Sequence, residues 1–232
     1  MSAGPSATGP VEQRIDTPHG EARLMTYAAD SPTATLLLSH GAGGGVDARD
    51  LVALAGALPA LGLSVVLLEQ PWRVAGRKLA TPPPTLDAAL LAAVAALRDG
   101  AAAGPLVLGG RSAGARSAAR CATRAGAAGC LALSFPLHPP GRPERSRLPE
   151  LLGAGVPVLV VQGERDTMGT PDEFPPGVEL SVVPDADHGL RVPARAVVSQ
   201  QEAMEIVVES ALEWVVREVA GNGTPGPGVQ PT

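Results

Sequence analysis

The chain has 232 residues, a length that suits one domain with a sizeable core, and a formal net charge of −5 at pH 7. Its residues are 45% apolar but only 2% aromatic, so we expect a core of Val, Leu and Ala. There is no basic tract, and no apolar run reaches the ~18 to 20 residues of a membrane span, so neither nucleic acid nor a membrane is an expected partner.

The two ends of the chain differ in composition from the rest. Residues 1–13 and 221–232 are rich in Gly and Pro and are predicted to be flexible, which leaves residues 14–220 as one domain. No apolar segment typical of a signal peptide follows the N-terminus, so we expect a cytoplasmic protein. In that compartment Cys121 and Cys130 are expected to be buried free thiols, with a disulfide as the alternative. No HExxH or paired CxxC motif is present, and we predict neither a metal nor a cofactor.

Short apolar runs alternate with helical patterns along the chain. Residues 21–27 alternate between polar and apolar and are typical of an antiparallel edge strand. Near-continuous apolar runs, as expected of strands buried on both faces, follow at 35–40, 63–70, 104–110, 130–135, 156–163 and 178–184. Helices are predicted at 48–61, 85–99, 113–125 and 199–220. This alternation predicts an α/β fold, with a mostly parallel sheet and helices on both faces.

The last predicted helix has a clear start signal and a clear apolar stripe. Ser199 is followed three residues later by Glu202, the pattern of a capping box. Apolar residues then recur at helical spacing at Met204, Val208, Ala211, Leu212, Val215 and Val219. We interpret this stripe as part of the core.

One serine lies between a predicted strand and a predicted helix. In the stretch LVLGGRSAGARSAAR (106–120), Ser112 has Gly110 and Gly114 two residues away on either side. In a chain this rich in glycine, about one sequence in six would contain G-x-S-x-G by chance, so the context must decide. Here the serine follows strand 104–110 and opens helix 113–125, as a nucleophile on a tight turn requires, whereas a helix N-cap is the alternative.

A serine nucleophile needs a base and an acid, and both are present in suitable positions. His188 lies just past the last predicted strand, and Asp166 follows strand 156–163. We predict that Ser112 attacks an acyl carbon, that His188 transfers the proton, and that Asp166 orients the imidazole. Asp185 and Asp187 compete for the acid role, but they lie too close to His188 in sequence to follow the preceding strand.

The oxyanion that such an attack creates needs backbone donors. One candidate is the amide of Ala113, at the start of a helix whose dipole favours negative charge. The second is expected in the glycine-rich loop after strand 35–40, where His40 and Gly41 precede Ala42, the best candidate donor. A phosphate-binding loop is the alternative, but no GK[ST] sequence follows.

Further polar and aromatic residues fall on loops at the same edge of the predicted sheet. His40 is expected to brace the glycine loop, and His138 either borders the pocket or fixes a loop. Together with Gly41 and Arg111, these two histidines are the residues expected at a possible substrate pocket. Arg111 could meet an anionic substrate together with Trp72, Arg73, Arg77 and Lys78, but solvated loop positions are the alternative that we favour.

Four stretches together resemble the α/β-hydrolase superfamily. They are LLLSHGAGGG (36–45), GGRSAGARSA (109–118), VQGERD (161–166) and DADHGL (185–190). The segments FPLHPPGRPE and VQGERDTMGTPDEF narrow the resemblance to a family of small bacterial hydrolases. Its domain is shared with a subunit of the eukaryotic non-specific-lethal chromatin complex and with a testis-expressed protein. More distantly the chain is similar to dienelactone hydrolases, which use cysteine where this chain has Ser112.

The resemblance covers roughly residues 20–220 and implies a single-domain α/β-hydrolase fold with an eight-stranded sheet, although the patterns above give only seven strands. We therefore predict a serine hydrolase that cleaves a carboxylic ester or thioester of a small acyl substrate. The alternative is a non-catalytic binding or scaffold protein, since the eukaryotic relatives serve as complex subunits. The connection 136–155 has room for one short helix, near 145–152, and for no substantial lid, which predicts a preference for short acyl groups.

Overall fold

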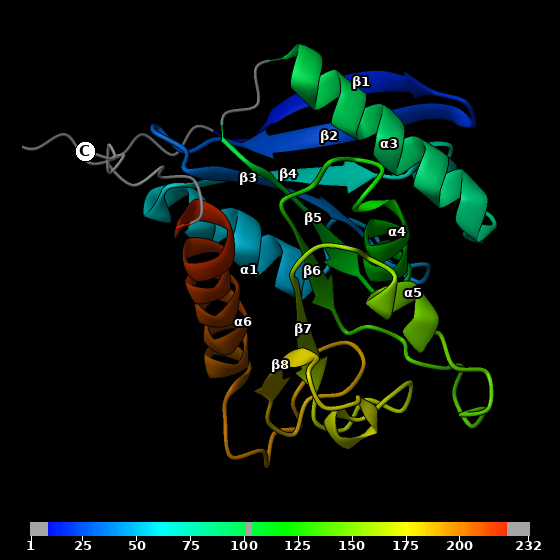
Figure 1. The fold of residues 1–232 in the computed structure, drawn as a ribbon, viewed down its shortest axis with the longest axis vertical. Coiled ribbons are helices and arrows are strands. Elements are labelled where there is room, and N and C mark those ends of the chain that lie inside the picture. The colour runs from blue at the N-terminus through cyan, green and yellow to red at the C-terminus, as the bar shows by residue number, and fades with distance from the viewer. Residues whose placement is uncertain (1–8, 101–103, 222–232) are drawn as a thin grey trace, which may run out of the picture.

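Eight strands form one sheet in the order β1-β2-β4-β3-β5-β6-β7-β8 (Figure 1). The computed structural model describes residues 9–100 and 104–221. The strands are β1 (Val11–Thr17), β2 (Gly20–Tyr27), β3 (Ala34–Ser39), β4 (Leu63–Glu69), β5 (Leu106–Arg111), β6 (Gly129–Leu133), β7 (Val158–Gly163) and β8 (Glu179–Val183). β2 pairs antiparallel with β1 and with β4, and every other pairing is parallel. The predicted mostly parallel sheet is therefore confirmed.

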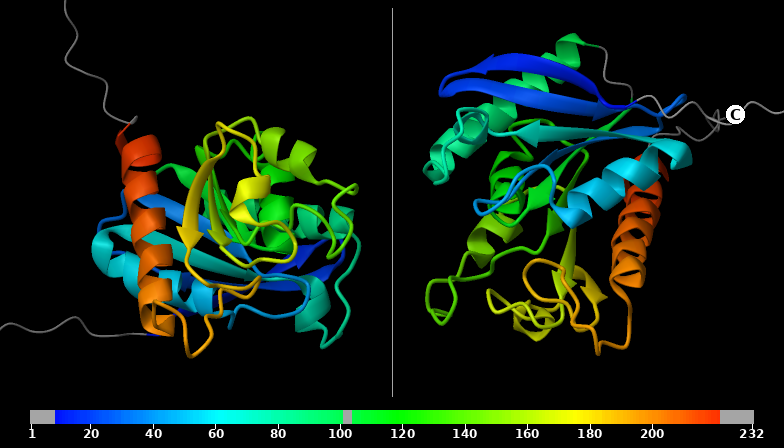
Figure 2. Two further views of the ribbon diagram at one scale, coloured as in Figure 1. Left: turned by 90° about the horizontal axis from the view of Figure 1, so that it is seen from below. Right: turned by 180° about the vertical axis from the view of Figure 1, so that it is seen from behind.

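Helices cover both faces of this sheet (Figures 1 and 2). The helical elements are α1 (Arg49–Ala57), the 3-10 turn η1 (Leu58–Leu61), α2 (Pro71–Val74), α3 (Pro83–Asp99), α4 (Ala113–Cys121), α5 (Leu148–Leu152), the 3-10 turn η2 (Pro171–Glu173), α6 (Gln200–Trp214) and the π-helical turn η3 (Val215–Ala220). Two buried clusters follow from this layering. One joins the sheet to α3, α4 and α5, and the other joins it to α1 and α6.

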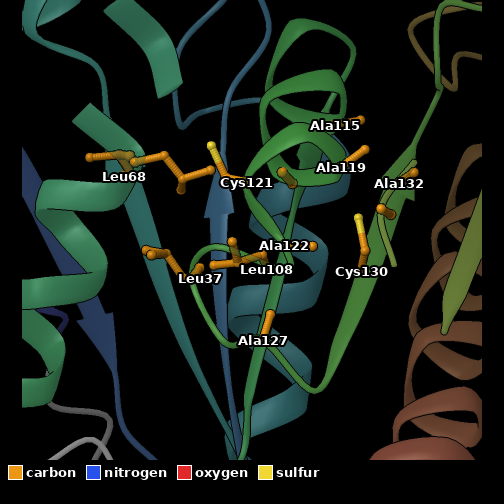
Figure 3. Close-up of a cluster of buried hydrophobic side chains, with 14 of the residues drawn as sticks. Leu37, Leu68, Leu108, Ala115, Ala119, Cys121, Ala122, Ala127, Cys130 and Ala132 are labelled. Carbon is orange, nitrogen blue, oxygen red and sulfur yellow. The ribbon is translucent and has the colours of Figure 1, made fainter. Parts of the chain in front are cut away.

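Small side chains let α4 lie close to the sheet. Ala115 and Ala119 of this helix belong to the same buried cluster as Leu37 and Leu108 of the central strands (Figure 3). Alanine on the inner face of a helix shortens the distance to the sheet, which compensates for the scarcity of aromatic residues. Both cysteines lie in this cluster as buried free thiols, and burial raises the pKa of the Cys121 thiol to about 11.

The strand that sequence patterns miss is β1. Its residues are mostly exposed, and only Ile15 is buried, so no apolar run marks it. Residues 21–27 do form an antiparallel strand, β2, but the prediction that it is the edge was wrong, because β1 pairs along its outer side. β1 begins at Val11, inside the segment predicted to be flexible. Residues 1–8 and 222–232, which make up most of the two predicted flexible ends, lie outside the described residues.

The C-terminal helix follows its predicted start, and its predicted apolar stripe packs against the core. The capping box of Ser199 and Glu202 is present, with both reciprocal hydrogen bonds formed. The buried face carries Ala203, Val207, Ala211 and Trp214, whereas Met204, Val208 and Leu212 of the predicted stripe are half-buried. Ala211, Val215 and Val219 of the predicted stripe are fully or almost fully buried in the same cluster as Trp214, so the interpretation of the stripe as part of the core is confirmed. The predicted helix 113–125 ends early, at Cys121, and residues 122–126 form turns.

The connection between β6 and β7 is short and holds no lid. Between Ser134 and Pro157 its helical element is α5, which is five residues long and coincides with the short helix predicted near 145–152. The carboxyl ends of the parallel strands are consequently not covered by an inserted domain (Figure 2).

Candidate active site

Ser112 occupies the sharp turn between β5, which ends at Arg111, and α4, which begins at Ala113. Its backbone has φ 54° and ψ −110°, a conformation that L-residues rarely adopt and that costs about 1–3 kcal/mol. The amide of Ser112 donates a hydrogen bond of 2.9 Å to the carbonyl oxygen of Leu133 on β6. The neighbouring strand therefore holds the strained turn in place.

Two glycines are needed for this turn, as the sequence predicts. A Cβ on Gly110 would lie 2.3 Å from the carbonyl oxygen of Ser39, and a Cβ on Gly114 would lie 2.2 Å from the same atom. Both distances are far below van der Waals contact with rigid backbone. Only glycine at these positions lets β5 and α4 pass so close to the end of β3.

Three of the predicted site residues form a hydrogen-bond chain. Ser112 Oγ lies 3.0 Å from His188 Nε2, and His188 Nδ1 lies 2.7 Å from Asp166 Oδ2. A carboxylate can only accept, so Nδ1 carries the proton and Nε2 is left to accept from the serine hydroxyl. Ser112 and His188 come from loops 76 residues apart in the sequence, and the fold brings them within hydrogen-bond distance.

The competing acids are engaged elsewhere. Asp187 Oδ1 accepts from the amides of Gly189 and Arg191 and so caps its own turn. Asp185 lies 3.8 Å from Arg165 and accepts from the amide of Val197. Among the three aspartates considered, Asp166 is the one that contacts the imidazole of His188.

Asp166 is fully buried and is held by two further donors. The amide of Met168 donates to Oδ1 at 2.8 Å, and Gln162 Nε2 donates to Oδ2 at 2.9 Å. Gln162 also bonds the carbonyl oxygen of Gly169 at 2.7 Å, which fixes the turn that carries the acid. Sequence reasoning missed Gln162, although a lone amide in the buried apolar run of β7 is a usable signal.

His40 is buried and both of its ring nitrogens are occupied. Nδ1 donates to the carbonyl oxygen of Gly41 at 2.8 Å, and Nε2 accepts from the amide of Gln70 at 3.1 Å. Its ring packs edge-on against Trp72 with centroids 5.4 Å apart. Burial lowers the pKa of His40, which favours the neutral ring that this bonding pattern requires. These contacts match the expected bracing role.

The glycine-rich loop after β3 lies directly beside the serine. A Cβ on Gly41 would lie 3.2 Å from Ser112 Cβ. Ala42 is exposed, and within the described residues neither its amide nor that of Ala113 donates a hydrogen bond. Both amides are thus available to an external acceptor.

A shallow cavity of about 300 Å³ reaches Arg111 and Gly189, the sequence neighbours of Ser112 and His188, although Ser112, His188 and Asp166 do not line it. It lies between the loop after β3 and the loop after β8. Its lining is small or polar: Gly44, Gly45, Asp47, Ala48, Arg49, Arg111 and Gly189.

Arg111, the residue before the serine, is not a solvated loop residue. Its side chain is 16% exposed, its Nη2 donates to the carbonyl oxygen of His188 at 3.0 Å, and its Nε lies 3.4 Å from Asp50 Oδ2. Asp50 is fully buried on α1. Burial raises the pKa of the Asp50 carboxyl, and the Arg111 guanidinium acts in the opposite direction. Sequence reasoning missed Asp50, because an aspartate at the start of a helix is usual.

The remaining loop residues divide between surface and core. Arg73, Arg77 and Lys78 are exposed, as the favoured alternative expects, whereas Trp72 is buried against His40.

His138 has hydrogen-bond partners at both ring nitrogens. Its Nδ1 lies 2.9 Å from the carbonyl oxygen of Pro139 and its Nε2 lies 2.8 Å from Glu173 Oε2. Both partners only accept, which favours the doubly protonated ring, and the hydrogen bond to Pro139 followed by that to Glu173 raises the pKa of His138. These two contacts suit the loop-fixing alternative, and a place at the border of the pocket stays a prediction.

Residues 9–100 and 104–221 contain neither a candidate metal site nor a candidate membrane span. No group of three or more His, Cys, Asp or Glu side chains in these ranges could hold a metal ion. No helix there is long and apolar enough to cross a membrane.

Comparisons with known proteins agree with this geometry at the level of the fold. An α/β serine hydrolase homologue from Coxiella burnetii superposes with a TM-score of 0.69 at 19% identity, over 89% of this chain and 99% of that one. A lidless α/β serine hydrolase from Xanthomonas campestris gives 0.69 at 18% identity, over 96% of this chain and all of that one. A dienelactone hydrolase from Anabaena variabilis gives 0.69 at 18% identity, over 91% and 100%.

These identities establish the fold alone, and no curated protein sequence matches the chain. The narrower resemblance to the chromatin-complex subunit and the testis-expressed protein stays a prediction. The family comparison goes further, because the model of the alpha/beta hydrolase domain matches residues 32–216. That match spans most of the sheet and every residue of the hydrogen-bond chain, and the protein therefore belongs to the α/β-hydrolase domain family.

Proposed function

We propose that this protein is a serine hydrolase that cleaves carboxylic esters or thioesters of small acyl substrates. The observation that carries the proposal is the chain from Ser112 through His188 to Asp166, with distances of 3.0 and 2.7 Å, at a strained strand-to-helix turn. Backbone strain at a residue whose hydroxyl faces a histidine is typical of an activated nucleophile.

In the first half of the reaction Ser112 Oγ attacks the acyl carbon while His188 Nε2 takes the hydroxyl proton. The tetrahedral intermediate collapses, the bond to the leaving alcohol or thiol breaks, and His188 returns the proton to the leaving group. A water molecule then attacks the acyl-serine, with His188 again accepting and returning one proton, and the carboxylic acid and free Ser112 result. Asp166 keeps the proton of the imidazole on Nδ1 throughout.

The negative charge on the substrate oxygen needs donors that are already in place. We assign this role to the amides of Ala113 and Ala42, which donate to no other described residue. Ala113 is the first residue of α4, where the helix dipole adds to the donor strength. The close approach of Gly41 to Ser112 puts the loop that carries Ala42 beside the reacting atom.

Small acyl groups suit the surroundings of Ser112. The adjoining cavity of about 300 Å³ has glycine, alanine and charged walls, and no lid covers it. Long acyl chains bind through extended apolar walls, and the lining of this cavity contains no large apolar side chain.

Covalent labelling with a fluorophosphonate probe tests the proposal. We expect the purified protein to be labelled once, at Ser112, and Ser112→Ala to abolish labelling. Ser117→Ala is the matched control, since Ser117 lies on the same helix but is buried and donates to Asp87 at 2.6 Å. A folded wild-type protein that resists the probe and hydrolyses no ester or thioester would contradict the proposal and favour a binding or scaffold role.

A further inference from the structure

The loop that carries His188 is held from two sides. Asp166 contacts the imidazole, whereas Arg111 donates to the main-chain carbonyl of the same residue at 3.0 Å. Arg111 is also the residue directly before Ser112. One side chain therefore ties the backbone of the proposed base to the backbone of the proposed nucleophile.

The His188 turn has a strained backbone, which is held by the Asp187 side chain within the turn and by Gln200 of α6, whose Nε2 donates to the carbonyl oxygen of Leu190 at 2.9 Å. Asp185 and Leu190, on either side of the histidine, have φ 56° and φ 50°, a left-handed conformation that is unfavourable for a side chain as bulky as leucine. On the β7 side, the amide of Arg165 donates a hydrogen bond of 2.9 Å to the carbonyl oxygen of Ala186 in this turn. Toward β5 and Ser112, the contacts of this turn within the described residues are the hydrogen bond from Arg111 to the His188 carbonyl and that between the His188 ring and Ser112.

Arg111 is in turn fixed by a buried acid on another element. Its Nε lies 3.4 Å from Asp50 Oδ2 on α1, a carboxylate oxygen that no hydrogen-bond donor reaches within the described residues. Asp50 Oδ1 accepts from the amide of Leu51, so the carboxyl group cannot rotate freely. A planar guanidinium with donors in a fixed fork can contact the carboxylate and the His188 carbonyl at once, which an ammonium cannot.

We propose that Asp50 and Arg111 form an internal strut that holds the His188 main chain at the correct distance from Ser112, so that Arg111 is a positioning residue for hydrolysis. This inference rests on the function proposed above. The rival role for Arg111 is to bind an anionic group of the substrate, because its side chain also borders the cavity beside the serine.

Steady-state kinetics separate the two roles. With 4-nitrophenyl acetate as substrate, we expect Arg111→Gln to lower kcat by about 10- to 100-fold, the size of loss that a displacement of about 1 Å causes, with KM within about threefold of wild type. Arg111→Lys should recover part of the lost kcat, and Asp50→Asn should lie between wild type and Arg111→Gln. An Arg111→Gln variant whose KM for acidic acyl esters rises while kcat is unchanged would overturn the strut in favour of substrate binding.

Arg116→Gln is the matched control for the loss of a half-buried arginine ion pair near the serine. Arg116 lies on α4, its side chain is 19% exposed, and it pairs with Glu150 at 2.6 Å without contacting His188. We expect this variant to keep kcat within about twofold of wild type. A loss of kcat in Arg116→Gln equal to that in Arg111→Gln would show a general packing effect and would overturn the proposal.

A second readout does not need activity. Labelling with histidine that carries ¹³C at the carbonyl gives resonances from the four histidines, and the His188 signal is the one that disappears in His188→Gln. Removal of the guanidinium should move this signal upfield in Arg111→Gln and leave it in place in Arg116→Gln. If the His188 carbonyl signal of Arg111→Gln does not move relative to wild type, the strut is refuted even if the enzyme is active. If the signal moves but the wild-type protein hydrolyses no ester or thioester, the contact is retained and the hydrolase function is refuted.

Discussion

The loops that follow β3 and β8 each bring a histidine to the same end of the sheet, and the two rings have opposite chemical environments. In the β3 loop (residues 40–48), His40 is buried and has both nitrogens committed to the backbone, at Gly41 and Gln70. In the β8 loop (residues 184–199), His188 has one nitrogen on Asp166 and the other on the serine hydroxyl. Both rings lie near Ser112, but only His188 has a ring nitrogen that faces the serine hydroxyl. This difference is why we propose His188 as the base and assign to His40 a role in bracing the loop.

The two loops also differ in what determines their backbone conformation. The β3 loop has glycines at 41 and 43–45 and lies against Ser112 closely enough that a Cβ at Gly41 would be 3.2 Å from the serine Cβ. The β8 loop has no helix or strand, and its shape depends on side chains from elsewhere, including Arg111. We infer that the first loop is a fixed wall for the substrate, whereas the second positions the proton-transfer group.

The difference between the two loops predicts that substitution of His188 or Ser112 causes the largest loss of kcat. We expect His188→Ala and Ser112→Ala each to lower kcat by about 10⁴- to 10⁶-fold, and the double variant to lose little more, because the two groups act as one unit. Turnover of 4-nitrophenyl acetate, corrected for background hydrolysis, measures this. Losses that add in the double variant would indicate that the two residues act independently and would break the assignment of His188 as the base.

The next effect concerns the acid. Replacement of the Asp166 carboxylate by an amide presents an NH₂ group to the imidazole and favours the tautomer with its proton on Nε2, so Asp166→Asn should lower kcat by about 10⁴-fold. Asp185→Asn is the control, since Asp185 contacts Arg165 and Val197 and leaves His188 untouched. A large loss in Asp185→Asn with none in Asp166→Asn would make the acid assignment wrong.

Sequence reasoning locates the residues that follow a recognisable strand. Ser112, Asp166 and His188 each come after an apolar run, and the carboxyl ends of parallel strands meet at one edge, so their proximity is predictable. His40, which ends the apolar run 35–40, is placed at this edge by the same logic, whereas the missing lid is predicted by the short connection 136–155.

Contacts between side chains distant in the sequence are not predictable in this way. Asp50 resembles an ordinary acidic residue of a first helical turn, and nothing local indicates that it faces Arg111. Gln162 stands out in the sequence as a lone amide in an apolar run, but its partners, Asp166 and Gly169, become evident only in the folded turn. β1 is not predicted from the sequence, because a mostly exposed edge strand needs no apolar pattern.

For His40, the histidine of the β3 loop, we expect a smaller effect on kcat than for His188. His40→Asn leaves the buried amide of Gln70 without its acceptor, so the free energy of unfolding should fall by about 1–3 kcal/mol while kcat stays within about tenfold of wild type. Urea denaturation and the same esterase assay measure both quantities. A loss of kcat as large as that of His188→Ala would show that His40 takes part in the chemistry.

The pH dependence of stability sharpens this prediction. Burial lowers the pKa of His40 below the ordinary value of 6.5, so between the lowered pKa and 6.5 the unfolded chain binds more protons than the native protein. The contribution of His40 is then complete above about pH 6.5 and falls as the pH drops below it, by at most about 1.4 kcal/mol per pH unit. His40→Asn should flatten the stability curve between about pH 6.5 and 5.5, which urea denaturation at a series of pH values measures.

The smallest effect concerns the acyl chain, which would lie between the two loops. A pocket that buried each added methylene would contribute about 0.8 kcal/mol per CH₂, or about fourfold in kcat/KM. The cavity beside Ser112 is shallow and is lined by glycine, alanine and charged residues from both loops, so its walls gain little from a longer chain. We therefore expect kcat/KM to change by less than about threefold from 4-nitrophenyl acetate to butyrate and not to rise for octanoate or palmitate, below or above micelle formation. A steady fourfold gain per methylene, or a jump at micelle formation, would show that one of the loops moves aside to open an apolar groove.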